Sequence, residues 1–174
     1  RYLDANGSSL PALDFARADT THVTAQQRPT GREYGAYMGL LNLFRFHQYN
    51  CDAVLGTTPF LLQDVLFNSI LCASIRALAL LQEALVQNSK EEQSDQNLGK
   101  LAASNHILAD QVAGAVRAKL WDGSTGYFYG FDLSGDRRLD TPTVASFMPL
   151  LGGIASQEQE HHLIGHLFAD EGFG

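Results

Sequence analysis

The sequence predicts an all-α protein, a partial α/α toroid that carries one β-hairpin near residues 126–140. Segments with a single apolar helical face alternate along the chain with segments that are apolar on nearly every side. Two concentric layers of helices require this alternation, because inner helices are covered all round and outer helices on one side only. Between two such segments lies a stretch rich in glycine, aromatic and acidic residues, whose turn signals are typical of a hairpin.

Composition favours a soluble globular domain. The chain has 174 residues, of which 45% are hydrophobic, enough for one domain with a core over residues 1–174. The formal net charge is -7, from 12 Lys+Arg and 19 Asp+Glu, and basic residues do not cluster. No nucleic-acid partner is therefore expected. No membrane span is expected either, because polar residues interrupt the longest apolar runs: Gln63, Asp64, Asn68 and Arg76.

The two cysteines, Cys51 and Cys72, lie in dissimilar surroundings, one in an expected loop and one in an apolar helix. Both are predicted to be free thiols, since their spacing fits neither a disulfide framework nor a metal site. No cofactor is expected. Arg1 is not a natural start, so localisation is left open, with the cytoplasm favoured.

The first predicted helix follows an irregular connection over residues 1–27. Thr30 and Glu33 form a capping box, which starts a helix that runs to about His47. One side of this helix is apolar: Tyr34, Tyr37, Met38, Leu41 and Phe44. Residues 48–59 are expected to form a loop.

The next two helices differ in character. Residues 62–85 are apolar nearly all round and should be buried on most sides. Residues 87–97 are polar and are predicted to form a solvated loop. The helix after it, ending at Leu120, is amphipathic. Its expected inward residues are Leu98, Leu101, Leu108, Val112 and Leu120, and its expected outward residues are Lys100, Asp110, Arg117 and Lys119.

The hairpin stretch then follows. Trp121-Asp122 closes the helix, residues 123–126 turn, residues 127–132 alternate as a strand, and residues 134–136 turn the chain back. Thr141 reads as an N-cap with Pro142 at the first helical position, opening a buried helix over residues 144–151 that Gly152-Gly153 ends. Ser156 and Gln159 form a capping box for a last amphipathic helix, which carries Leu163, Ile164, Leu167 and Phe168.

In a toroid every outer-to-inner connection falls at one end, so the loop before Leu61 and the hairpin should meet there. The hairpin is expected to present Tyr127, Phe128, Tyr129 and Asp132 at this end. Aromatic faces beside a carboxylate suit a sugar, offering stacking for its C–H face and an acceptor for its hydroxyls. The alternative is a hairpin that only closes the end of a helical core.

Asp64 and Asn68, one turn apart, could contact a substrate or organise a loop. For Asp64 the favoured interpretation is simpler, a carboxylate at a helix N-terminus, stabilised by about 0.3–1 kcal/mol. His162 and His166 lie four apart, with Glu158 a turn earlier, but a solvated helix face is favoured over a metal site.

Asp19 and His22 could be taken for a catalytic pair. No nucleophile elbow accompanies them, so a loop-ordering hydrogen bond is favoured.

Blocks of the chain, taken in order, are similar to one enzyme family: Asp19-Thr20-Thr21-His22-Val23, Arg28-Pro29, residues 62–68, residues 120–132 and Phe147-Met148-Pro149-Leu150. They resemble the (α/α)6-barrel glycoside hydrolases that include processing α-glucosidase I and the bacterial mannosylglycerate hydrolases. Six helix pairs close that barrel, so the five helices expected here imply about half of it.

The resemblance implies an inverting hydrolase of α-linked glucosides or mannosides, such as mannosylglycerate, with a carbohydrate substrate. The family's general acid lies in a Glu-Ser-Gly-x-Asp-Asn-Ser segment before residues that resemble Arg1-Tyr2. Its base lies beyond residues that resemble 171–174. Both are expected outside this chain, so no catalytic residue is assigned within it. The expected substrate-binding residues are Tyr127, Tyr129, Asp132, Asp64 and Asn68.

A second hypothesis is a non-catalytic α-helical interaction module. The helix expected over residues 62–85 would lack several neighbours of a closed barrel, which leaves apolar surface open. A homodimer through this helical edge is therefore expected.

Overall fold

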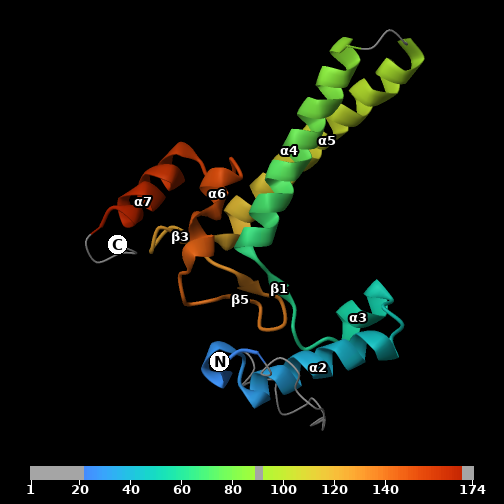
Figure 1. Ribbon diagram of the computed structural model, residues 1–174. Helices are drawn as coiled ribbons and strands as arrows, with labels where there is room; N and C mark the ends of the chain where they lie inside the picture. The colour runs from blue at the N-terminus through green and yellow to red at the C-terminus, as the bar shows by residue number, and fades with distance from the viewer. Residues whose placement is uncertain (1–21, 89–91, 170–174) are drawn as a thin grey trace. The chain divides into compact units, whose positions relative to one another are not determined.

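The computed structural model describes residues 22–88 and 92–169. Its contacts divide the chain into two units, Arg1–Leu61 and Leu62–Gly174, and each unit is described by itself. The described residues of both units are mainly helical (Figure 1). Of the sequence blocks named above, residues 19–21 lie outside the described residues, and so does Asp19 of the Asp19–His22 pair.

The first unit contains η2 (Ala25–Gln27), α2 (Gly31–Phe46) and α3 (Cys51–Thr57). The predicted capping box of α2 is confirmed, because Thr30 Oγ1 accepts from Glu33 N and Glu33 Oε2 accepts from Thr30 N at 2.7 Å. Thr30 N and, at 2.8 Å, Thr30 Oγ1 both donate to Glu33 Oε2, and these two bonds lower the pKa of the Glu33 carboxyl.

One expectation for the first unit is wrong. The predicted loop over residues 48–59 contains α3, because Asn50 Oδ1 accepts from Ala53 N at 3.0 Å and caps that helix. On the predicted apolar side of α2, Tyr34, Met38 and Phe44 are half-buried, and Tyr37 and Leu41 are exposed.

The second unit is built on two long helices, α4 (Val65–Asn88) and α5 (Glu92–Leu120), which lie side by side (Figure 1). The polar loop predicted over residues 87–97 is wrong, since α4 continues to Asn88 and α5 begins at Glu92. Glutamine and glutamate, frequent in this stretch, are good helix formers, so polarity alone did not end either helix.

Small residues form the buried contact between these helices: Ser69, Cys72, Ala79, Ala102, Ala109 and Ala113. Cys72 Sγ donates to Ala109 O at 3.4 Å, which shows how close the helices come. Two leucines predicted to point inward on α5, Leu101 and Leu108, are exposed instead. Both cysteines are free thiols, as predicted, and burial raises the pKa of the Cys72 thiol.

The predicted burial of α4 on most sides is also wrong. Only Val65, Ser69, Cys72 and Ala79 are buried along it, and Phe67 is 75% exposed. Its main neighbours in the described part of the chain are α5 and the short helices after the hairpins, which leave its other sides open. By length and composition α4 is also the one described helix that could cross a membrane, with a mean hydropathy of 1.7. The core helix of a soluble protein passes the same test, so this is weak support for a span.

The hairpin stretch contains two hairpins rather than the one predicted. β2 (Trp121–Asp122) pairs with β3 (Tyr127–Phe128), and β4 (Phe131–Asp132) pairs with β5 (Arg137–Arg138), all antiparallel. The strand predicted over residues 127–132 is thus interrupted. Tyr129 N donates to Leu120 O at 2.9 Å, which ties the chain to the end of α5 between the two short strands.

The predicted meeting of the two connections at one end is confirmed. β1 (Leu62–Gln63), directly before α4, pairs antiparallel with β4, so that Leu62 faces Asp132 and Gln63 faces Phe131. Segments nearly 70 residues apart are thereby joined where α4 begins and α5 ends.

The chain after the hairpins forms η3 (Val144–Phe147), α6 (Met148–Leu151) and α7 (Gln157–Leu167). The N-cap of η3 is Thr143, not Thr141, since its hydroxyl accepts from Ala145 N at 3.2 Å. The proline in the first turn of α6 is Pro149, not Pro142. Val144 and Leu151 are exposed, so this run is not buried all round. The capping box of α7 at Ser156 and Gln159 is confirmed.

Two arginines hold the turn between α6 and α7. Arg76 Nη1 donates to Gly152 O at 2.8 Å and to Gly153 O at 2.7 Å, and Arg117 Nη1 donates to Ile154 O at 2.7 Å. Arg117 was predicted to point outward, but its guanidinium satisfies a carbonyl of this turn instead.

Candidate substrate-binding face at the hairpins

The β2–β3 hairpin is organised by Asp122. One carboxylate oxygen accepts from Ser124 Oγ at 2.7 Å and from Ser124 N at 2.9 Å. These hydrogen bonds, the hydroxyl first and the backbone second, lower the pKa of Asp122. The side chain is therefore an ionised acceptor committed to its own turn.

Asp132 plays the same part in the β4–β5 hairpin. It is 4% exposed, and its Oδ1 accepts from Ser134 N at 3.0 Å and from Gly135 N at 3.1 Å. Arg137 Nε lies 3.9 Å from Oδ2. The carboxylate predicted to receive sugar hydroxyls thus has one oxygen engaged in the turn and the other beside an arginine.

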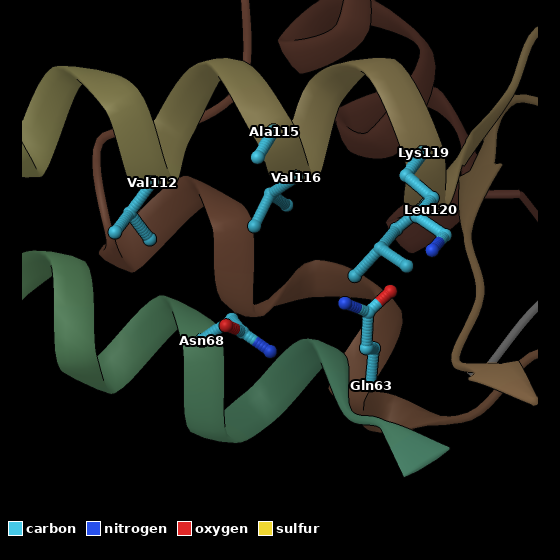
Figure 2. Close-up of a pocket in the computed structure, with 7 residues that line it drawn as sticks. All are labelled: Gln63, Asn68, Val112, Ala115, Val116, Lys119 and Leu120. Carbon is cyan, nitrogen blue, oxygen red and sulfur yellow. The ribbon is translucent and has the colours of Figure 1, made fainter. Parts of the chain in front are cut away.

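Asp64 and Asn68 occupy the start of α4. Asp64 Oδ1 accepts from Phe67 N at 2.8 Å, which is the helix-terminus role favoured from the sequence. Asn68 Nδ2 donates to Asp64 O at 2.7 Å. Asn68 also lines a hollow of about 130 Å³ between α4 and α5 (Figure 2), the one predicted site residue that does so.

The aromatic side chains of the hairpins pack against α7. Tyr127 stacks on His166, with ring centroids 3.9 Å apart and planes at 15°, and His166 Nε2 lies 3.0 Å from Thr125 O. Trp121 packs on Phe128 at 4.9 Å and on His162 at 6.1 Å. Phe128 is fully buried, so the expectation that the hairpin presents it is wrong. Its ring fills the core beneath.

Sequence reasoning missed the role of His162 and His166, which pack on hairpin aromatics. Their spacing of four residues, considered for a metal, also places two rings on one helix face, where neighbouring aromatics can stack on them. In the described part of the chain, no three histidine, cysteine, aspartate or glutamate residues are grouped so as to hold a metal.

Tyr127 and Tyr129 contact each other edge to face, with ring centroids 6.3 Å apart. Tyr129 is nearly buried, yet neither tyrosine hydroxyl makes a hydrogen bond within residues 22–88 and 92–169. Neither hydroxyl is among the buried polar atoms without a partner, so both reach the surface.

Replacing Gly126 with alanine should lower the free energy of unfolding by about 1–2 kcal/mol, because Gly126 has a φ of +71° that disfavours a Cβ atom. An added Cβ would also come 2.9 Å from His166 Nε2, so the Tyr127–His166 stack should loosen. Chemical denaturation measures the loss, and the His166 ring resonances report the stack. Gly123→Ala is the control, since its Cβ meets only an ordinary contact at 3.6 Å. Equal losses in both variants would contradict this account.

In the second unit the connection that leads into α4 pairs with the hairpin stretch that precedes η3, and connections that meet at one end are the arrangement expected in an α/α toroid. The family model for the mannosylglycerate hydrolase MGH1-like glycoside hydrolase domain matches residues 7–174, and the chain belongs to this family. The resemblance seen in the sequence blocks is thereby confirmed.

Individual relatives agree. A mannosylglycerate hydrolase of Rubrobacter radiotolerans is 31% identical over 160 residues, covering 92% of this chain and 33% of that protein. A glucosylglycerate hydrolase of Mycolicibacterium hassiacum is 27% identical over 164 residues, covering 94% and 34%. A crystal structure of a GH63 mannosylglycerate hydrolase from Thermus thermophilus, in complex with Tris, matches with a TM-score of 0.77 and 27% identity, covering 95% and 37%. The predicted partial α/α toroid is confirmed, and the chain spans about a third of the length of these relatives.

Proposed function

We propose that the chain forms part of the catalytic domain of an inverting glycoside hydrolase that acts on α-linked glucosides or mannosides, such as mannosylglycerate. The observation that carries this proposal is the family match over residues 7–174. The relatives' names add the substrate class, since they are hydrolases of mannosylglycerate and glucosylglycerate.

In this proposal the end of the second unit that carries the β2–β3 and β4–β5 hairpins forms one wall of the sugar site. The Tyr127 and Tyr129 hydroxyls, which lack protein partners in the described residues, would bind sugar hydroxyls. Asp132, Asp64 and Asn68 would shape the same wall, because their hydrogen bonds fix the β4–β5 turn and the start of α4.

The general acid and base are proposed to come from parts of the protein outside this chain. Inversion uses two carboxyl groups about 6.5–9.5 Å apart, one protonated and one free to activate water. At the hairpin end Asp64, Asp122 and Asp132 each accept hydrogen bonds from their own helix start or turn. Such carboxylates are held as structural acceptors.

Sequencing the genomic flanks tests this proposal directly. An upstream Glu-Ser-Gly-x-Asp-Asn-Ser segment and a downstream Tyr-Trp-Arg-Gly segment are the expected result. Flanks without either segment would overturn the hydrolase proposal and favour a non-catalytic module.

Sugar binding by the chain itself should be measurable. Glucose, mannose or mannosylglycerate should perturb Trp121 fluorescence or shift the Tyr127 and Tyr129 resonances, with millimolar affinity, about -4 kcal/mol. Tyr129→Phe removes only the hydroxyl and should weaken binding about 2–10-fold. The matched control is Tyr37→Phe, an exposed position on α2. A folded sample with no saturable response to any of the three sugars would leave the hairpins as structure only.

A second candidate, an interaction module, is favoured by the open apolar face. We define this face by the exposed large residues that recur at helical spacing on one side of α4: Phe67, Leu71, Leu78, Leu81 and Leu85. Soluble monomers rarely leave more than a few hundred Å² of contiguous apolar surface uncovered. We propose that a second copy of the chain covers it, as a two-fold homodimer.

The chain should therefore behave as a dimer. A standard interface buries about 800 Å² on each partner, and burial of apolar surface stabilises association by about 25 cal/mol per Å². Light scattering during size-exclusion chromatography over a tenfold dilution range measures the mass. Leu81→Glu, at a position 63% exposed, should shift the mass toward the monomer without unfolding the chain. A concentration-independent mass near 19.0 kDa for the unaltered chain would rule out the dimer.

A further inference from the structure

The hollow between the start of α4 and the end of α5 has a mixed lining. Its walls are Gln63, Asn68, Val112, Ala115, Val116, Lys119 and Leu120 (Figure 2). Figure 2 shows Val112 and Val116 pointing from α5 toward α4, and the Gln63 amide reaching toward Leu120. The hollow is partly open to solvent and has a volume of about 130 Å³. The space therefore suits a guest of a few heavy atoms.

One polar atom in this lining lacks a partner. Gln63 Oε1 is buried and accepts no hydrogen bond from any described residue. The Gln63 backbone is fixed by its pairing with Phe131, so the amide is held at the hollow. A buried carbonyl oxygen without a donor is unfavourable, and a guest that brings an N–H or O–H relieves it.

The neighbouring polar groups do not supply that donor. Asn68 Nδ2 donates to Asp64 O at 2.7 Å and not to Gln63 Oε1. Lys119 Nζ lies 4.2 Å above the centre of the Phe131 ring, where the cation is stabilised by the ring face. The hollow thus offers an acceptor, an apolar wall and a nearby positive charge.

These three features select the charge and polarity of a guest. Lys119 disfavours a cation, and a carboxylate group cannot donate the hydrogen bond that Gln63 Oε1 lacks. The side chains of Val112, Val116 and Leu120 favour C–H groups over water alone. A neutral molecule with both hydroxyl and C–H groups satisfies all three.

We propose that this hollow binds a small neutral polyol of about glycerol size, one hydroxyl donating to Gln63 Oε1 and the carbon chain contacting α5. The hollow shares Asn68 with the wall proposed for the sugar site but contains neither Tyr127 nor Tyr129, and the proposal does not depend on catalysis. It lies beside the β1–β4 pairing, because Gln63 belongs to both. A molecule bound in the hollow should therefore also shift the resonances of the β4–β5 hairpin.

The test is a glycerol titration of the full 174-residue chain, followed by the methyl resonances of Val112, Val116 and Leu120. Saturable shifts in the millimolar range are expected. Gln63→Leu removes the acceptor and should weaken binding roughly tenfold. Ala115→Leu, on the exposed side of the lining, fills the hollow and should abolish the shifts. Gln111→Leu makes the same chemical change at an exposed α5 position and is the matched control.

Saturation in the unaltered chain and in Gln111→Leu, with loss in the other two variants, supports the site. Shifts that grow linearly with glycerol, or that persist unchanged in Gln63→Leu and Ala115→Leu, would show that only water occupies the hollow. Ala115→Leu alone decides the matter if Gln63→Leu does not fold, since position 115 is exposed and leucine is a good helix former.

Discussion

Phe128→Ala should lower the free energy of unfolding of the Leu62–Gly174 unit by about 3–5 kcal/mol, the usual cost of deleting a buried phenylalanine ring. Phe128 is fully buried in the core of this unit, together with Leu120, Ile154 and Leu163, and its ring lies 4.9 Å from that of Trp121. These neighbours belong to several elements, so they cannot collapse together into the vacated space without strain. Urea unfolding followed by the fluorescence of Trp121, the single tryptophan, measures the change.

Phe168→Ala is the matched control. This residue caps the end of α7 and is 84% exposed, so the same chemical change should alter stability by no more than about 0.5 kcal/mol. Equal effects at the two positions would mean that the β2–β3 hairpin is not packed into the core as the structure shows.

Local signals in the sequence predicted the helix starts well. The capping boxes at Thr30 and Ser156 each combine a hydroxyl with a Glu or Gln three residues on, and both form as predicted. The η3 start shows the limit of such signals. The sequence predicted Thr141 as the cap, whereas in the structure Thr143 Oγ1 accepts from Ala145 N and Thr143 N donates to Ser146 Oγ.

Which side chains are buried was harder to predict, because large apolar side chains were expected to lie inward. The α4–α5 contact is made by Cys72, Ala109 and Ala113, whose small side chains let the helices approach, while Leu101 and Leu108 remain exposed. Hydrophobic periodicity indicates that a face is apolar but does not say whether a neighbour covers it. Covering depends on which other helices are present.

The candidate site shows the same limit at the level of single residues. The sequence predicted correctly that Asp132 lies in a hairpin and Asp64 at the start of α4. The sequence pattern of a carboxylate in a turn is the same, however, whether the carboxylate binds backbone N–H groups or a ligand. In the structure both carboxylates accept from backbone N–H groups. The stacking of Tyr127 on His166 joins residues 39 positions apart, which no local pattern reveals.

The chain of 174 residues should hydrolyse no glycoside above background, since general acid–base catalysis contributes about 10²–10⁴-fold per positioned group and both groups are proposed to lie outside it. Assays with mannosylglycerate, α-mannosides and α-glucosides measure this. Asp64→Asn and Asp132→Asn are the decisive variants, because each keeps a carbonyl acceptor for the backbone N–H groups that the carboxylate now binds. Turnover that survives repurification and disappears in either variant would show that a carboxylate of this chain is catalytic.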